Sequence, residues 1–148
     1  MRPGSADESG QITVMILGYV ALALLVATVV MGISAVYLEH KRLLSLADGA
    51  SLAAADSYTL GEVDSRGGTP SAVLNPARVR NVAADFVAQS PAAQRFSDLA
   101  VTGATGTPDG STAVVVLRAA VHPPVVNFLV PDGIRIEATS TARSRLTR

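Results

Sequence analysis

The feature that most constrains this chain is a long uncharged stretch near its N-terminus. Residues 12–38, ITVMILGYVALALLVATVVMGISAVYL, contain no Asp, Glu, Lys, Arg or His over 27 consecutive positions. The hydrocarbon core of a bilayer is about 30 Å thick, and a helix of about 20 apolar residues crosses it. Because the run exceeds this minimum, it predicts a transmembrane helix that spans the bilayer with some tilt.

Two other interpretations fit the run less well. A signal peptide has a basic first segment and an apolar segment of roughly 7–15 residues. Here the preceding residues, 1–11, hold one Arg against two acidic residues, and the apolar run is longer. A helix that is apolar all round can also be buried in a large protein, but only about 110 residues remain to surround it. We therefore expect a short polar tail at 1–11 and a single-pass anchor at 12–38.

Composition argues against several classes of function. The formal net charge is zero, from 12 basic and 12 acidic residues, which gives no electrostatic basis for a nucleic-acid partner. The absence of Cys excludes disulfides and thiolate chemistry. His40 and His122 lie far apart without an i, i+4 ligand partner, and no nucleophile or phosphate-loop motif occurs. We predict no catalytic residues, no cofactor and no metal site.

A second helical segment continues directly from the span. Residues 39–58, EHKRLLSLADGASLAAADSY, contain no Pro, so we expect one continuous helix from Ile12 to about Tyr58. Small and apolar residues recur on one face of it at helical spacing. This face packs either on the chain's own domain alone or also on a neighbouring copy or partner helix. We predict it as a helix-packing interface formed by Leu43, Ala47, Ala50 and Ala54.

The next stretch predicts a linker followed by a second helix. Residues 59–75 are rich in Gly and include Pro70, which interrupts regular structure. Asn75 suits a helix N-cap, and a proline at the following position suits the first helical turn. A proline at position 91 ends the helix. The apolar positions of this amphipathic helix are Val79, Val82, Ala83, Phe86 and Val87.

Three strand-like runs follow, at 97–105, 112–121 and 134–139. The middle run, TAVVVLRAAV, is rich in Val, and the turn Pro108-Asp109-Gly110 connects it to the first. The last run alternates between apolar and polar residues, which is typical of a sheet with one wet face. The sequence therefore predicts an α+β fold: a long N-terminal helix, then a small domain at 76–148 with one further helix and a three-stranded antiparallel sheet.

An apolar segment, HPPVVNFLVPDG, lies between the last two strands. Its prolines prevent a central strand there. It forms either a lid folded onto the core or an exposed loop that touches a partner or the bilayer surface. We predict an apolar contact loop formed by Val125, Val126, Phe128, Leu129 and Val130.

Residues 10–56 resemble the N-terminal region of the Tad/Flp pilus-assembly family, the TadE/TadG-like proteins of the actinobacterial type. The resemblance is carried by GQITV at 10–14, SAVYL at 34–38, RLL at 42–44 and LADGASLAAA at 46–55. A long helix followed by a small sheet is also the layout of pilin-like proteins. The chain departs from processed pilins at Met15, where they carry Glu, and has no Asp at 31–33, where some relatives do. The resemblance therefore gives no basis for expecting processing at Gly10, or the role that this Asp has in relatives, in this chain.

The resemblance implies a structural, non-catalytic component of Flp-type pilus assembly or a related secretion apparatus. The implied partners are the lipid bilayer and other Tad/Flp pilus-assembly proteins, and a second copy of the chain is a further candidate. It also implies a cytoplasmic N-terminus and an extracytoplasmic C-terminal domain. The flanking cations, Arg2 before the span and Lys41 and Arg42 after it, slightly favour the opposite orientation. The alternative function is a membrane-tethered envelope sensor or ligand-binding domain.

Overall fold

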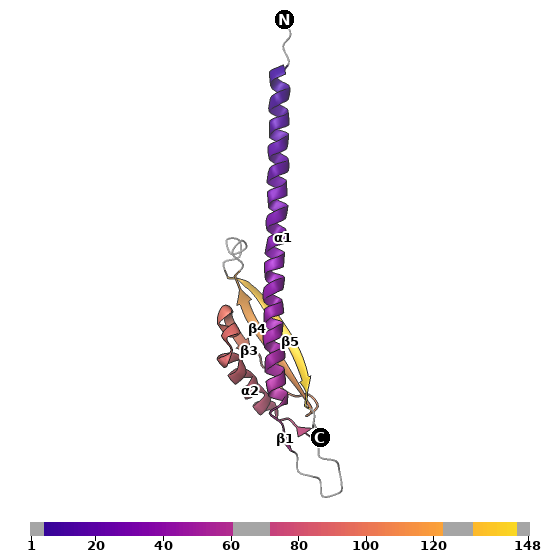
Figure 1. The fold of residues 1–148 in the computed structure, drawn as a ribbon, viewed down its shortest axis with the longest axis vertical. Helices are drawn as coiled ribbons and strands as arrows, with labels where there is room; N and C mark the ends of the chain where they lie inside the picture. Colours follow the sequence, from indigo (N-terminus) through magenta and orange to yellow (C-terminus); the bar gives the residue numbers. More distant parts are fainter. Residues whose placement is uncertain (1–4, 61–71, 123–131, 145–148) are drawn as a thin grey trace.

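The computed structural model describes residues 5–60, 72–122 and 132–144, and its dominant element is one long helix with a small domain at its C-terminal end (Figure 1). Helix α1 runs without a break over Ser5–Ala55, 51 residues. It begins before the expected Ile12 and ends before the expected Tyr58. Beyond its end, Ser57 donates from its backbone N–H and its Oγ to the carbonyl of Ala54. This satisfies one of the carbonyls that a helix end leaves unpaired.

The domain is built on a three-stranded antiparallel sheet in the order β3-β4-β5, which confirms the predicted α+β fold. Its strands are β3 (Ser97–Val101), β4 (Thr112–Val121) and β5 (Ile134–Arg143). Strands β4 and β5 pair along their whole length, from Thr112↔Arg143 to Val121↔Ile134. On β5, Ile136, Ala138 and Ser140 are buried and the intervening residues are exposed, as the alternating sequence predicts.

Three short elements were not expected from the sequence. Within the segment read as a linker, strands β1 (Thr59–Leu60) and β2 (Ala72–Val73) pair antiparallel. A 3₁₀-helix, η1 (Pro91–Arg95), connects the second helix to β3. The two strands have two residues each, and η1 is a short 3₁₀-helix between two longer elements, so none of the three shows a hydrophobic periodicity in the sequence.

The second helix, α2 (Pro76–Gln89), begins and ends as its sequence predicts. The side chain of Asn75 accepts hydrogen bonds from the backbone N–H groups of Ala77 (2.9 Å) and Arg78 (3.3 Å). Pro76 occupies the first helical position, where a missing N–H costs nothing. The buried residues of α2 are Val79, Ala83 and Val87.

The core lies between the C-terminal half of α1 and the inner face of the sheet, with α2 alongside α1 (Figure 1). Small residues on both sides let the helix approach the strands closely, because alanine side chains occupy little space between two backbones. The alanines of the core cluster on these elements are Ala47, Ala50, Ala54 and Ala55 on α1 and Ala113, Ala119 and Ala138 on β4 and β5. Gly49 allows a similarly close approach of α1 to α2, since a Cβ at this position would come within 2.6 Å of the Phe86 ring.

One polar pair is enclosed in this apolar contact. The Oγ atoms of Ser51 on α1 and Ser140 on β5 lie 3.1 Å apart, and both side chains are buried. Ser51 donates to the carbonyl of Asp48 at 2.9 Å, so its hydroxyl oxygen is left to accept from Ser140. Buried hydroxyls are costly unless they are hydrogen-bonded. The pair therefore favours one axial position of α1 against β5.

The turn before β4 is held by one carboxylate. Asp109 accepts from the backbone N–H groups of Ser111 (2.9 Å) and Thr112 (2.6 Å) and from Thr112 Oγ1 (2.8 Å). These hydrogen bonds, led by that of Ser111, hold the pKa of Asp109 well below its usual value. The adjacent Gly110 has a φ of +70°, a conformation that glycine adopts without strain.

Replacing Asp109 with asparagine should weaken the acid sensitivity of the domain. A carboxylate with a depressed folded-state pKa stabilises the fold above its unfolded pKa, near 3.9. That stabilisation is lost as the pH falls through this value toward the lower folded-state pKa. Asparagine keeps an acceptor oxygen but does not titrate. Urea unfolding at pH 7 and pH 3 should therefore show a smaller pH effect in Asp109→Asn than in the parent chain, and an equal effect would contradict this assignment.

Candidate functional site

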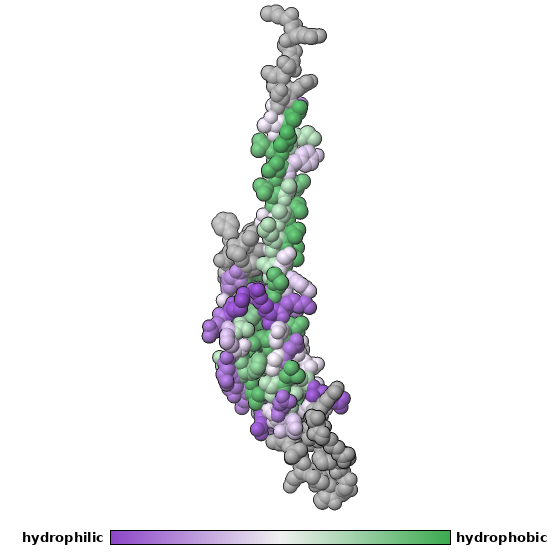
Figure 2. All heavy atoms as spheres, viewed as in Figure 1, coloured by the Kyte–Doolittle hydropathy of each residue, from purple (hydrophilic) through white to green (hydrophobic). Residues whose placement is uncertain are grey.

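The N-terminal part of α1 is an apolar rod outside the domain. Its large hydrophobic side chains, from Ile12 to Ile33, are each more than half exposed. Among the described residues, one helix is long and apolar enough to cross a membrane, and it is this one, over Gly10–Ala55. Figure 2 shows apolar residues along the visible side of this rod and a band of hydrophilic residues where it meets the domain.

The predicted helix-packing face of α1 lies inside the domain. Leu43, Ala47, Ala50 and Ala54 are each 0% exposed and belong to the core formed with the sheet and α2. In the structure these residues pack on the chain's own domain. In this conformation the four residues have no surface left for a partner helix.

The opposite face of α1 is open to solvent along the domain. Lys41, Ser45 and Asp48 are exposed on it, as their positions off the alanine-rich face predict. One large apolar side chain, Leu52, is 61% exposed on the same side. This face, at helical spacing from Lys41 to Leu52, is the part of the juxtamembrane helix that a neighbouring protein can reach.

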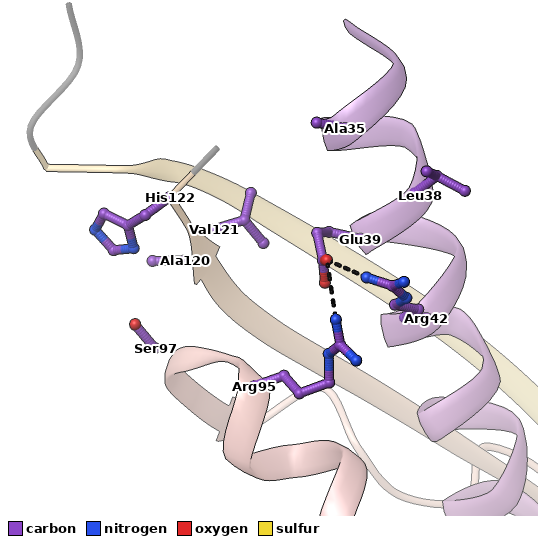
Figure 3. Close-up of a pocket in the computed structure, with 9 residues that line it drawn as sticks. All are labelled: Ala35, Leu38, Glu39, Arg42, Arg95, Ser97, Ala120, Val121 and His122. Carbon is purple, nitrogen blue, oxygen red and sulfur yellow. Dashed lines mark hydrogen bonds and ion pairs between the residues drawn. The ribbon is translucent and has the colours of Figure 1, made fainter. Parts of the chain in front are cut away.

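A groove lies where α1 leaves the apolar rod and meets the domain. Its volume is about 360 Å³. It is formed by α1, by η1 with the start of β3, and by the end of β4 (Figure 3). The lining residues are Ala35, Leu38, Glu39, Arg42, Arg95, Ser97, Ala120, Val121 and His122.

Three charged groups converge in this groove. Glu39 Oε1 accepts from Arg42 Nη1, one turn further along α1, and lies 3.8 Å from Arg95 Nη2 on η1. Figure 3 shows the carboxylate of Glu39 between the two guanidinium groups. The side chain of Glu39 is 25% exposed, whereas those of Arg42 and Arg95 are 46% and 56% exposed. One carboxylate is therefore shared by two more accessible cations.

The two histidines lie near this end of the domain but have different surroundings. His40 donates from Nε2 to the backbone carbonyl of Glu137, at 3.1 Å, and so links α1 to β5. His122 follows the last residue of β4 and lies against the turn at Gly133. Among the described residues, no group of three or more His, Cys, Asp or Glu side chains is arranged to hold a metal ion.

The predicted apolar contact loop cannot be placed. Val125, Val126, Phe128, Leu129 and Val130 lie outside the described residues. No pattern in the sequence indicates the Glu39–Arg95 pair, because η1 has no recognisable signal and nothing connects Arg95 to α1. The local spacing of Glu39 and Arg42, three residues apart on a helix, was the only available signal.

In comparison with known proteins, one family model matches a part of the chain. Residues 10–57 match the family model Tad, described as putative Flp pilus-assembly TadE/G-like. This confirms the resemblance found in the sequence, and the matched segment extends from the exposed apolar rod to just past the end of α1. No curated protein and no solved structure matches the chain.

Proposed function

We propose that this chain, whose helix α1 carries the segment matched by the TadE/G-like family, is a single-pass membrane component of a Tad/Flp-type pilus-assembly or related secretion system. Its role is structural and involves no catalysis. The observation that carries this proposal is the continuity of α1, which supplies both an exposed apolar rod and the central element of a folded domain.

The lengths fit a membrane-anchored arrangement. Val36 is already packed against the core of the domain, so the rod between Ile12 and Ser34 is the part of the apolar run available to lipid. Twenty-three residues of helix measure roughly 35 Å, close to the thickness of a hydrocarbon core of about 30 Å. Residues 1–11 then form a cytoplasmic tail, and the segment after residue 38 lies outside the membrane.

The domain is built to move together with its anchor. Leu43, Leu46 and the buried alanines of α1 belong to the core that this helix forms with the sheet and α2, without an intervening linker. A displacement of the helix along its axis therefore displaces the whole domain by the same amount. This rigid coupling suits a component that positions a domain in an assembly, whereas a sensor needs a ligand site on the domain itself. The inner face of the sheet, where such a site would be sought, is filled by α1.

The proposed partners are other Tad/Flp pilus-assembly proteins and, as a further candidate, a second copy of the chain. Since the alanine-rich face of α1 is enclosed, we propose that contact occurs through the open face from Lys41 to Leu52. The apolar residues of segment 125–130 remain a second proposed contact.

Topology gives the first test of this proposal. A reporter enzyme that is active only outside the cytoplasm should be active when fused after Arg148 and inactive when fused before Met1. A cytoplasmic reporter should give the reverse pattern. The reverse result for both reporters would overturn the orientation, and release of the chain by alkaline extraction of membranes would overturn the anchor.

Partner contact gives the second part of the test. A photo-crosslinking residue placed at Leu52, on the open face, should join the chain to another pilus-assembly protein or to a second copy in native membranes. The matched control is the same residue at Ala84, which is exposed on α2. Equal crosslinking at both positions, or none at Leu52, would argue against this face as the contact.

A further inference from the structure

We propose that the groove between α1, η1 and the end of β4 binds the headgroup of an anionic phospholipid, with the lipid phosphate accepting from N–H groups of Arg42 and Arg95 that Glu39 does not engage. The inference rests on the proposed membrane anchoring of α1 and adds a specific lipid site to it. Three features of the groove support it. These are its position along α1 at the end of the lipid-facing segment, its excess of accessible cations, and the division of its lining into apolar and charged parts.

The groove lies at the depth where the lipid-facing rod ends. Its first lining residues, Ala35 and Leu38, are the last turn of the apolar run, and Glu39 is the first charged residue after it. One turn of helix rises about 5.4 Å, so Arg42 lies within a turn of this boundary. Arg95 is brought to the same depth by its contact with Glu39, at 3.8 Å. Phospholipid headgroups occupy this level, on either side of a hydrocarbon core.

The charges of the groove favour an anion. Arg42 and Arg95 share the single carboxylate of Glu39, which leaves one positive charge uncompensated. Each guanidinium has five N–H donors, and it binds phosphate oxygens in the same fork geometry as a carboxylate. Lys41 adds a cation to the same turn of α1, with its Nζ 5.6 Å from the ring centre of Tyr37. Tyrosines are enriched at this level of membrane proteins.

A further cation at this end of the domain is already paired with a carboxylate of its own. Arg118 on β4 lies 3.1 Å from Glu137 on β5, with each side chain at least half exposed. This pair lies outside the groove and has one carboxylate for one guanidinium. Arg118 and Glu137 neutralise each other, whereas the cluster around Glu39 has one more guanidinium group than carboxylates. A lipid phosphate can neutralise this remaining positive charge.

The lining of the groove is divided into an apolar part and a charged part, as a phospholipid molecule is. Toward the rod its wall is apolar, formed by Ala35 and Leu38 of α1. Beyond these lie the two guanidinium groups, with Ser97 and His122 across the groove (Figure 3). A lipid that enters from the bilayer keeps its upper acyl chain against the apolar wall while its phosphate reaches the arginines. The volume, about 360 Å³, lies within the usual range for small-ligand pockets, about 300–1,000 Å³.

Lipid selectivity of the full chain tests this site. The chain is reconstituted in phosphatidylcholine bilayers that contain a trace of spin-labelled phosphatidylglycerol or spin-labelled phosphatidylcholine. The protein-associated fraction of each label gives a selectivity ratio. The parent chain should prefer phosphatidylglycerol, and Arg42→Gln and Arg95→Gln should each lower the ratio by roughly three- to fivefold. Glu39→Gln should raise it, because both guanidinium groups then lack a protein carboxylate.

The matched control is Arg118→Gln, which removes a cation of similar exposure, 59% against 56% for Arg95, that is also ion-paired. It should leave the ratio close to that of the parent chain. An equal loss in Arg118→Gln and Arg95→Gln would overturn the site, since only the general charge of the domain would then matter. Incorporation of the parent chain without any selectivity would overturn the lipid site while leaving the anchor intact. Failure of the chain to enter neutral bilayers would overturn both.

Discussion

Replacing Ala50 with leucine should destabilise the domain by about 2–3 kcal/mol, because the added carbons have no space to enter. Ala50 is 0% exposed and lies in the contact between α1 and the sheet. A leucine there must either adopt an unfavourable rotamer or push the helix away from the strands. Urea unfolding of the full chain in detergent, followed by brief proteolysis of the unfolded fraction, should show a clearly lower midpoint.

The matched control is Ala84→Leu, the same substitution on the exposed side of α2. It should change the free energy of unfolding by less than about 0.5 kcal/mol, as surface substitutions usually do. The pair also separates the two readings of the alanine-rich face. If Ala50→Leu left the stability unchanged but abolished association with another protein, the face would be a partner surface and the packing described above would be wrong.

Most of the elements could be predicted because their signals are local. The start of α2 is encoded by Asn75 and Pro76, which act on backbone groups within three residues of them. The strands β4 and β5 follow from Val-rich and alternating runs, which report on burial along one strand. The apolar run of α1 needs only composition to be recognised.

The long-range contacts, those of the groove included, were not predictable by the same means, because their residues come together only in the folded domain. Ser51 and Ser140 are 89 positions apart, and His40 reaches Glu137 across 97. Arg95 joins Glu39 only because η1 turns toward α1, and a five-residue 3₁₀-helix has no periodic signal. For Leu43, Ala47, Ala50 and Ala54 the sequence identified the face but not its partner. A stripe of small residues is equally suited to a strand of the same chain and to a helix of another.

Replacing Leu43 with alanine should destabilise the domain by about 2–5 kcal/mol, the usual cost of truncating a buried leucine. Leu43 is 0% exposed and is among the largest fully buried side chains of the described residues. Alanine removes three carbons and leaves a cavity that the surrounding helix and strands close only in part. Leu52→Ala, the same substitution on the open face of α1 at 61% exposure, should cost less than about 0.5 kcal/mol.

The loss of stability should be confined to the domain. The N-terminal rod of α1 makes its backbone hydrogen bonds within itself, and in a bilayer these do not depend on the core around Leu43. Hydrogen exchange of Leu43→Ala in bilayers should therefore accelerate at β4, β5 and α2, while the amides between Ile12 and Ser34 stay protected. Equal acceleration in the rod would mean that its helix is held by the domain and not by lipid, and that outcome would contradict the transmembrane assignment.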